Sequence, residues 1–121
     1  MRFLHLTEDA AGVSHFADGE IALQSGDFAP PAPRVMASAI EACARFLYLL
    51  LPPGWDGPQH RAPHRQVAFC LAGRLRVVAG DGESREIGPG SIWRIEDTTG
   101  SGHTTTVVGD RDVELAIVQL E

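Results

Sequence analysis

The sequence predicts an all-β protein, a sandwich or a barrel, from two observations. First, short apolar runs alternate with glycine- and proline-containing turns from residue 45 to residue 120, and no helix is needed there. The turns recur at about eight to twelve residues, a spacing typical of all-β folds. Second, the run Arg45–Leu51 has the length and aromatic content of a buried strand rather than a helix. The main turns are Ala72-Gly73, Gly80-Asp81-Gly82, Gly88-Pro89-Gly90, Asp97-Thr98-Thr99-Gly100 and Gly109-Asp110-Arg111.

The strands can be placed in order along the chain. Val35–Ala44 has alanine and glutamate residues that suit a helix, but it is short and uncapped, so a strand is preferred. Residues 27–33 read as an extended connector, because each proline fixes φ and biases the preceding residue away from helix. The expected strands are Arg2–Leu6, Glu20–Gln24, Val35–Ala44, Arg45–Leu51, Gln66–Leu71, Arg74–Ala79, Glu83–Ile87, Ser91–Glu96, His103–Val108 and Asp112–Leu120.

Alternation within these strands predicts which side chains face the core. An unpaired buried arginine is very costly, so Arg74 and Arg76 should face outward and the opposite row inward. The opposite row of the last strand is polar only at Glu114, and if it faces outward it needs an apolar cover, such as a second sheet or a subunit partner. This row favours a homodimer, and so does the proline-stiffened N-terminal arm, which would lie across a partner. The expected inner rows are Leu75, Val77, Ala79; Ser91, Trp93, Ile95; and Val113, Leu115, Ile117, with Gln119 near the rim.

Length and composition bound the function. A chain of 121 residues predicts one domain, with strands or an arm over residues 1–42 and a barrel core over 43–121. The net charge of −6 argues against nucleic acid and anionic membranes as partners. Phe46–Leu51 is too short to span a membrane, and the N-terminus lacks a signal peptide pattern. Cys43 and Cys70 are expected as buried, reduced thiols, and the protein as cytoplasmic, with no nucleotide cofactor.

Histidines are concentrated around one stretch of the chain and one later position. His60, His64 and Gln66 lie in the segment that begins at Trp55, and His103 follows Gly102. Their spacing resembles the two motifs of the cupin superfamily. His60, Gln66 and Gly73 match the first histidine, the glutamate position and the closing glycine of the first motif, and Gly90 and His103 match the ends of the second. Further similarity is to small single-domain bacterial cupins without an assigned reaction, carried by Leu51-Pro52-Pro53-Gly54-Trp55, Gly88-Pro89-Gly90 and the run from Glu96 to His103.

This resemblance implies an antiparallel jelly-roll β-barrel with a pocket at one end. The sequence departs from the first cupin motif at two positions. Ala62 stands where the first motif has its second histidine, and Gln66 stands where it has a carboxylate. The candidate metal ligands are therefore His60, Gln66 and His103, with His64 as a fourth, for zinc, nickel, copper or iron. Asp56 or Asp97 would supply a missing carboxylate, although Asp97 is expected to cap the turn at Thr98 and Thr99.

Two classes of function compete for this pocket. In the first, His60 and His103 are catalytic residues of an enzyme acting on a small organic acid, enol or carbonyl compound, as an isomerase, lyase or oxygenase. In the second, the barrel is a non-catalytic module that binds or senses a small molecule. Trp55 and Trp93 are expected to line the pocket in either case.

Overall fold

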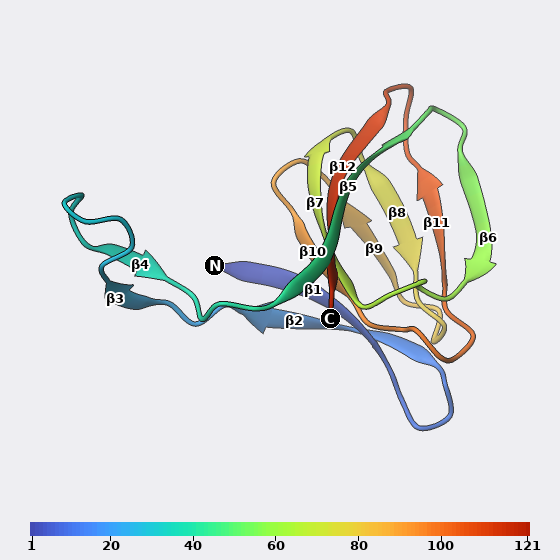
Figure 1. Cartoon of the computed structure of the whole chain (residues 1–121). Coiled ribbons are helices and arrows are strands. Elements are labelled where there is room, and N and C mark those ends of the chain that lie inside the picture. Colours follow the sequence, from blue (N-terminus) through green and yellow to red (C-terminus); the bar gives the residue numbers. More distant parts are fainter.

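A computed structural model describes residues 1–121 and contains twelve strands and no helix (Figure 1). The strands are β1 (Arg2–Glu8), β2 (Ser14–Glu20), β3 (Gln24–Gly26), β4 (Val35–Ala37), β5 (Cys43–Leu51), β6 (Asp56–His60), β7 (Gln66–Ala72), β8 (Leu75–Val78), β9 (Ser84–Ile87), β10 (Ile92–Ile95), β11 (His103–Val107) and β12 (Val113–Leu120). The all-β prediction is confirmed. None of the chain forms a helix of the kind that could span a membrane.

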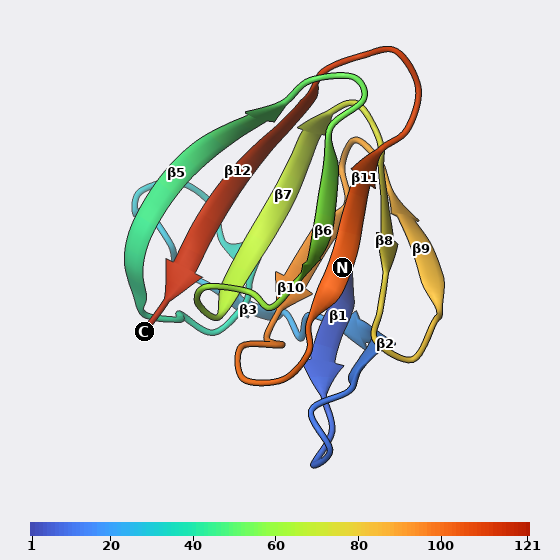
Figure 2. The same cartoon turned by 90° about the vertical axis from the view of Figure 1, so that its right-hand side faces the viewer.

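Two sheets face each other and form the barrel. One sheet has the order β2-β1-β10-β7-β12-β5, and the other has the order β6-β11-β8-β9. Figure 2 shows β5 at the outer edge of the first sheet, and β6 and β11 of the second sheet in front of the interior. Within these sheets the strands pair antiparallel, except for β1 and β10, which pair in parallel. The short hairpin of β3 and β4 forms a separate two-stranded sheet that projects from the barrel.

Four elements differ from the sequence prediction. β2 occupies residues expected to form a polar loop, and β6 lies within the motif segment. Both are polar edge strands, so they lack the apolar runs on which the prediction relied. The strand expected at Glu20–Gln24 is absent, since β2 ends at Glu20 and β3 begins at Gln24. The strand expected at Val35–Ala44 is interrupted, because residues 38–42 are not in a strand.

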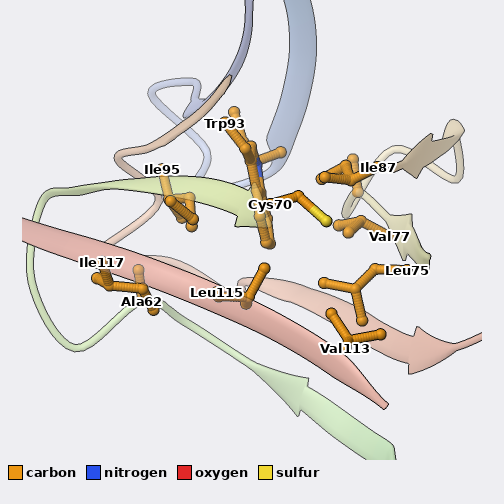
Figure 3. Close-up of a cluster of buried hydrophobic side chains, with 13 residues drawn as sticks. Ala62, Cys70, Leu75, Val77, Ile87, Trp93, Ile95, Val113, Leu115 and Ile117 are labelled. Atoms are coloured by element: carbon orange, nitrogen blue, oxygen red, sulfur yellow. The ribbon is translucent and has the colours of Figure 1, made fainter. Parts of the chain in front are cut away.

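The core lies between the two sheets and confirms most predicted faces. Leu75, Val77 and Val113 are completely buried, and Trp93, Ile95, Leu115 and Ile117 are nearly so. Figure 3 shows these side chains packed together with Ile87 and the thiol of Cys70. Burial raises the pKa of the Cys70 thiol, as expected for an inert core cysteine. Cys43 is exposed, so its predicted burial was wrong: it starts the edge strand β5, where no neighbour covers it.

The outer face of the larger sheet is apolar across β5, β12 and β7. Phe46, Tyr48 and Leu50 on β5 are each more than half exposed, at 55%, 71% and 58%. Ala116 on β12 has Tyr48 and Phe69 as its strand partners on either side, and these larger side chains explain its low exposure of 8%. Ala116 therefore faces outward, as expected for its row on β12. Its apolar cover comes from larger side chains of the same sheet.

A polar cluster fixes the β1–β2 turn against the second sheet, close to His103. The ring of His15 lies between two carboxylates, with Nε2 2.7 Å from Asp9 and Nδ1 3.0 Å from Asp81. The hydrogen bond to Asp9, with a further one to Asp81, raises the pKa of His15. The neighbouring Ser14 is completely buried, donates from Oγ to the carbonyl of Gly102 at 2.7 Å, and accepts from the Gly80 amide at 2.6 Å. The backbone just before His103 is thereby held in place.

Candidate functional site

The barrel encloses a cavity of about 250 Å³ between the two sheets. Eleven of its seventeen lining residues are hydrophobic. Five residues singled out in the sequence line it: Trp55, His60, Gln66, Trp93 and His103. The polar ones lie at one end, because β6 ends at His60, β7 begins at Gln66 and β11 begins at His103. These are the strand ends at the lower side of the barrel in Figure 2.

His60 and His103 are brought together by direct pairing of β6 and β11. The two residues are strand partners, and a register irregularity follows at His103. Their ring centroids are 4.9 Å apart. Gly102 makes this approach possible, since it has φ of +81° and its α-carbon faces the backbone of His60. A Cβ at this position would lie 2.0 Å from the His60 carbonyl oxygen.

The His103 ring is buried and held by a carboxylate. Nδ1 of His103 lies 2.6 Å from Oδ2 of Asp97, and the two side chains are 4% and 0% exposed. A carboxylate accepts hydrogen bonds, so Nδ1 is the protonated nitrogen and Nε2 of the neutral ring carries a free lone pair. Asp97 Oδ1 has no hydrogen-bond partner, so the carboxylate is directed at His103 alone. The Trp93 ring packs edge-on against the imidazole at 5.6 Å.

This arrangement corrects the role predicted for Asp97. The carboxylate that caps the turn is Glu8 of β1, which accepts from the amides of Thr99 and Gly100 at 2.9 and 2.7 Å. The hydroxyl of Thr99 also donates to Glu8, and these hydrogen bonds lower the pKa of Glu8. Because Glu8, which is distant in sequence, caps the turn, the side chain of Asp97 can form its hydrogen bond with His103 instead.

His60 has the same tautomer by a different contact. Its Nδ1 lies 2.8 Å from the backbone carbonyl oxygen of Pro58, which can only accept, so Nδ1 donates. The ring itself is more exposed than that of His103. Both imidazoles therefore keep Nε2 free for a proton, a metal ion or a ligand.

Gln66 and Ala62 occupy the two positions that depart from the cupin motif. Gln66 is 8% exposed, and its Oε1 accepts from Gln119 Nε2 at 3.4 Å. Ala62 is 3% exposed and forms part of the cavity wall, with its amide donating to the Asp97 carbonyl at 3.1 Å. Gln119, expected near the rim, also lines the cavity. The polar end is thus formed by two imidazoles and two amides.

Other sequence candidates lie away from this group. His64 is exposed, does not line the cavity, and contacts Nη2 of Arg45 at 2.9 Å through its Nε2. Asp56 is exposed at the start of β6, at the opposite end of that strand from His60. No group of three or more histidine, cysteine, aspartate or glutamate side chains is arranged so that it could hold a metal ion. The functional contact that sequence reasoning missed is the pair Asp97–His103.

Comparison with known proteins supports the fold. The crystal structure of a Cupin 2 conserved barrel domain protein from Salinispora arenicola is 20% identical, with a TM-score of 0.52 over 82% of this chain and 74% of that one. A protein from Thermotoga maritima described as a predicted oxalate decarboxylase is also 20% identical, with a TM-score of 0.50 over 84% and 95% of the two chains. The cupin domain of Cnp3 from Schizosaccharomyces pombe is 12% identical, with a TM-score of 0.50 over 89% and 73%.

No curated protein matches the chain. At these levels of identity the structural likeness establishes the barrel and leaves the chemistry open. The family profile of the cupin domain, Cupin_2, matches residues 47–119, from β5 to the end of the cavity-lining row on β12. The matched region contains every residue at the polar end of the cavity. The resemblance inferred from the two motifs is confirmed, and the chain belongs to the cupin family.

Proposed function

We propose that the barrel binds a small, largely apolar organic acid or carbonyl compound and that His103 transfers a proton on it. The observation that supports this proposal is the buried pair Asp97–His103 at the polar end of a mainly apolar cavity. A histidine whose Nδ1 is held by a carboxylate presents Nε2 as a base in a fixed orientation.

The proton transfer proceeds without a net change in composition. Nε2 of His103 takes a proton from a carbon next to the substrate carbonyl, and the electron pair of that bond forms the enolate. The negative charge of Asp97 stabilises the imidazolium that results. The same Nε2–H then returns the proton, either to the original carbon or to another carbon of the enolate system. The reaction class is therefore isomerisation or proton exchange, which needs no oxidant.

A divalent metal ion is an additional component that the donor atoms fit. Nε2 of His60 and of His103 are free, and Oε1 of Gln66 lines the same end of the cavity. These are ligand types that zinc, nickel, copper or iron accept, although the set carries no negative charge and should bind weakly. A bound metal ion would polarise a substrate oxygen. Because the metal and the transferred proton would compete for His103 Nε2, the two roles can be separated by adding a chelator.

Deuterium exchange into a 2-oxo acid tests the proposal. The protein is incubated with 2-oxohexanoate in heavy water, with and without chelator, and exchange at the carbon next to the carbonyl is followed by NMR. We expect His103→Gln to lower the exchange rate by about 10²–10⁴-fold, the usual contribution of a general base. Arg111→Gln, which alters an exposed turn away from the cavity, should leave the exchange rate unchanged. Equal exchange in the wild type and His103→Gln would contradict the proposal.

A non-catalytic binding module is the second candidate, and it is favoured by the lining itself. Eleven of the seventeen lining residues are hydrophobic, and only two are histidines. Such a cavity can bind a small molecule without any residue acting as a catalyst. In that case ligands would bind without deuterium exchange, and His103→Gln would show the same lack of exchange as the wild type.

The unpaired thiols Cys43 and Cys70 support the expected cytoplasmic location. We further propose that the protein is a homodimer, for the reasons given in the Discussion.

A further inference from the structure

The inner row of β5 ends in a charged residue at the rim of the cavity. Leu47, Leu49 and Leu51 line the cavity, and alternate residues of a strand share one face. Arg45 is the next member of that row, two residues before Leu47. Its strand partner is Gln119, which in turn pairs with Gln66 on β7. Arg45 therefore continues the lining row at the same end as His60 and His103.

The guanidinium of Arg45 reaches across the rim without meeting a carboxylate. Its Nη2 donates to Nε2 of His64 at 2.9 Å, so the side chain extends from β5 to the loop that joins β6 and β7. That loop also contributes Pro63 to the cavity wall. Arg65 in the same loop lies 3.6 Å from Glu96, whereas no aspartate or glutamate lies within salt-bridge distance of Arg45.

Only three arginines, Arg45, Arg61 and Arg111, have no carboxylate within salt-bridge distance, and of these only Arg45 continues the cavity-lining row of β5. The chain has 16 acidic residues and 10 basic ones, so carboxylates are abundant. Most arginines of the barrel are paired, including Arg76 with Glu86, Arg85 with Asp18 and Arg94 with Glu41. At the cavity rim the positive charge of Arg45 has only a neutral nitrogen acceptor and remains available to an anion.

We propose that Arg45, with the amide of its strand partner Gln119 and that of Gln66 on the strand beyond, binds the carboxylate of an otherwise apolar ligand. The inference rests on the proposed function, since it uses the same cavity, and it narrows the substrate class to monocarboxylates. A planar guanidinium suits a carboxylate because it can donate two parallel hydrogen bonds. The apolar body of the ligand would lie against Leu47, Leu49 and Leu51. No arginine or lysine lines the cavity, which disfavours a second carboxylate on the ligand.

Tryptophan fluorescence provides a direct test. Both tryptophans of the chain line the cavity, so occupancy should change the emission. Titration with hexanoate is compared with titration by hexanamide, which has the same apolar body and no charge. We expect hexanoate to bind more tightly, and Arg45→Gln to raise its Kd about tenfold, as for the loss of one charged hydrogen bond. The affinity for hexanamide should be unaffected by this substitution.

The matched control is Arg111→Gln, which removes one positive charge from an exposed turn away from the cavity. It should leave both affinities unchanged, and both variants should unfold at the temperature of the wild type. An equal Kd for hexanoate in Arg45→Gln and wild type, or no binding of hexanoate to the wild type, would overturn the inference. The same titration on His103→Gln separates the two proposals. Binding that depends on Arg45 in a protein without exchange activity supports this inference and rejects the proposed proton transfer.

Discussion

Gly102→Ala is expected to be among the most destabilising single substitutions in this protein and to separate the two histidines. The positive φ of +81° costs an alanine about 1–2 kcal/mol. The added Cβ would also lie 2.0 Å from the His60 carbonyl oxygen and 2.4 Å from the Arg61 amide nitrogen. Both are backbone atoms, so β6 and β11 must move apart. We expect a total loss of about 4 kcal/mol, measured by urea unfolding.

Gly54→Ala is the matched control for this prediction. Gly54 has nearly the same φ, +82°, but a Cβ there would meet nothing within 4 Å. Its substitution should therefore cost only the conformational term, about 1–2 kcal/mol. If Gly102→Ala were no more destabilised than Gly54→Ala, the close approach of β6 and β11 described here would be wrong.

A single acidic substitution on the outer face of the larger sheet is expected to convert a dimer into a monomer. Phe46, Tyr48, Leu50 and Leu71 are all more than half exposed there, and exposed apolar surface of this extent marks an interaction site. An outer groove of about 500 Å³, lined largely by hydrophobic residues, extends this surface beyond Phe69 toward β1. The β3–β4 arm adds its own uncovered side chains, with Phe28 79% and Ile40 100% exposed.

A second copy of the chain is the partner that would cover both surfaces at once, with its arm lying across the sheet. We expect the wild type to sediment as a dimer at micromolar concentration, and Tyr48→Glu to sediment as a monomer near 13.0 kDa. Ala10→Glu, which adds the same charge in the exposed β1–β2 turn, should remain dimeric. A monomeric wild type would reject the homodimer.

The parts of the fold that could be predicted are those in which one strand carries its own signal. The alternation in β8 and β10 follows from the cost of burying Arg76 or Arg94, and needs no knowledge of neighbouring strands. β6 and β2 carry no such signal, because edge strands with polar residues are defined by the strands they pair with. The parallel pairing of β1 with β10 is likewise a long-range contact that no local pattern specifies.

The candidate site shows the same division between features signalled within one segment and features that depend on long-range contacts. His60 and His103 were found through motif spacing, which reflects where β6 ends and β11 begins. Asp97 was assigned to the nearest backbone amides, but Glu8 from β1 satisfies them instead and Asp97 turns to His103. No local pattern singles out Arg45 in the sequence. It lies at the cavity rim only because Leu47, Leu49 and Leu51 of the same strand face inward. Contacts between segments that are far apart in the sequence therefore determine the chemistry of this site.

The central claim is that His60 and His103 each hold a proton on Nδ1 and keep Nε2 free at the cavity. A long-range ¹⁵N–¹H correlation spectrum of the histidine rings tests it directly, at a pH where the rings are neutral. His60→Gln and His103→Gln samples assign the signals. The structure predicts the Nδ1–H tautomer for both rings, since Asp97 and the Pro58 carbonyl accept from them. An Nε2–H tautomer on His103 would contradict the claim, because that nitrogen could then neither accept a proton nor bind a metal ion.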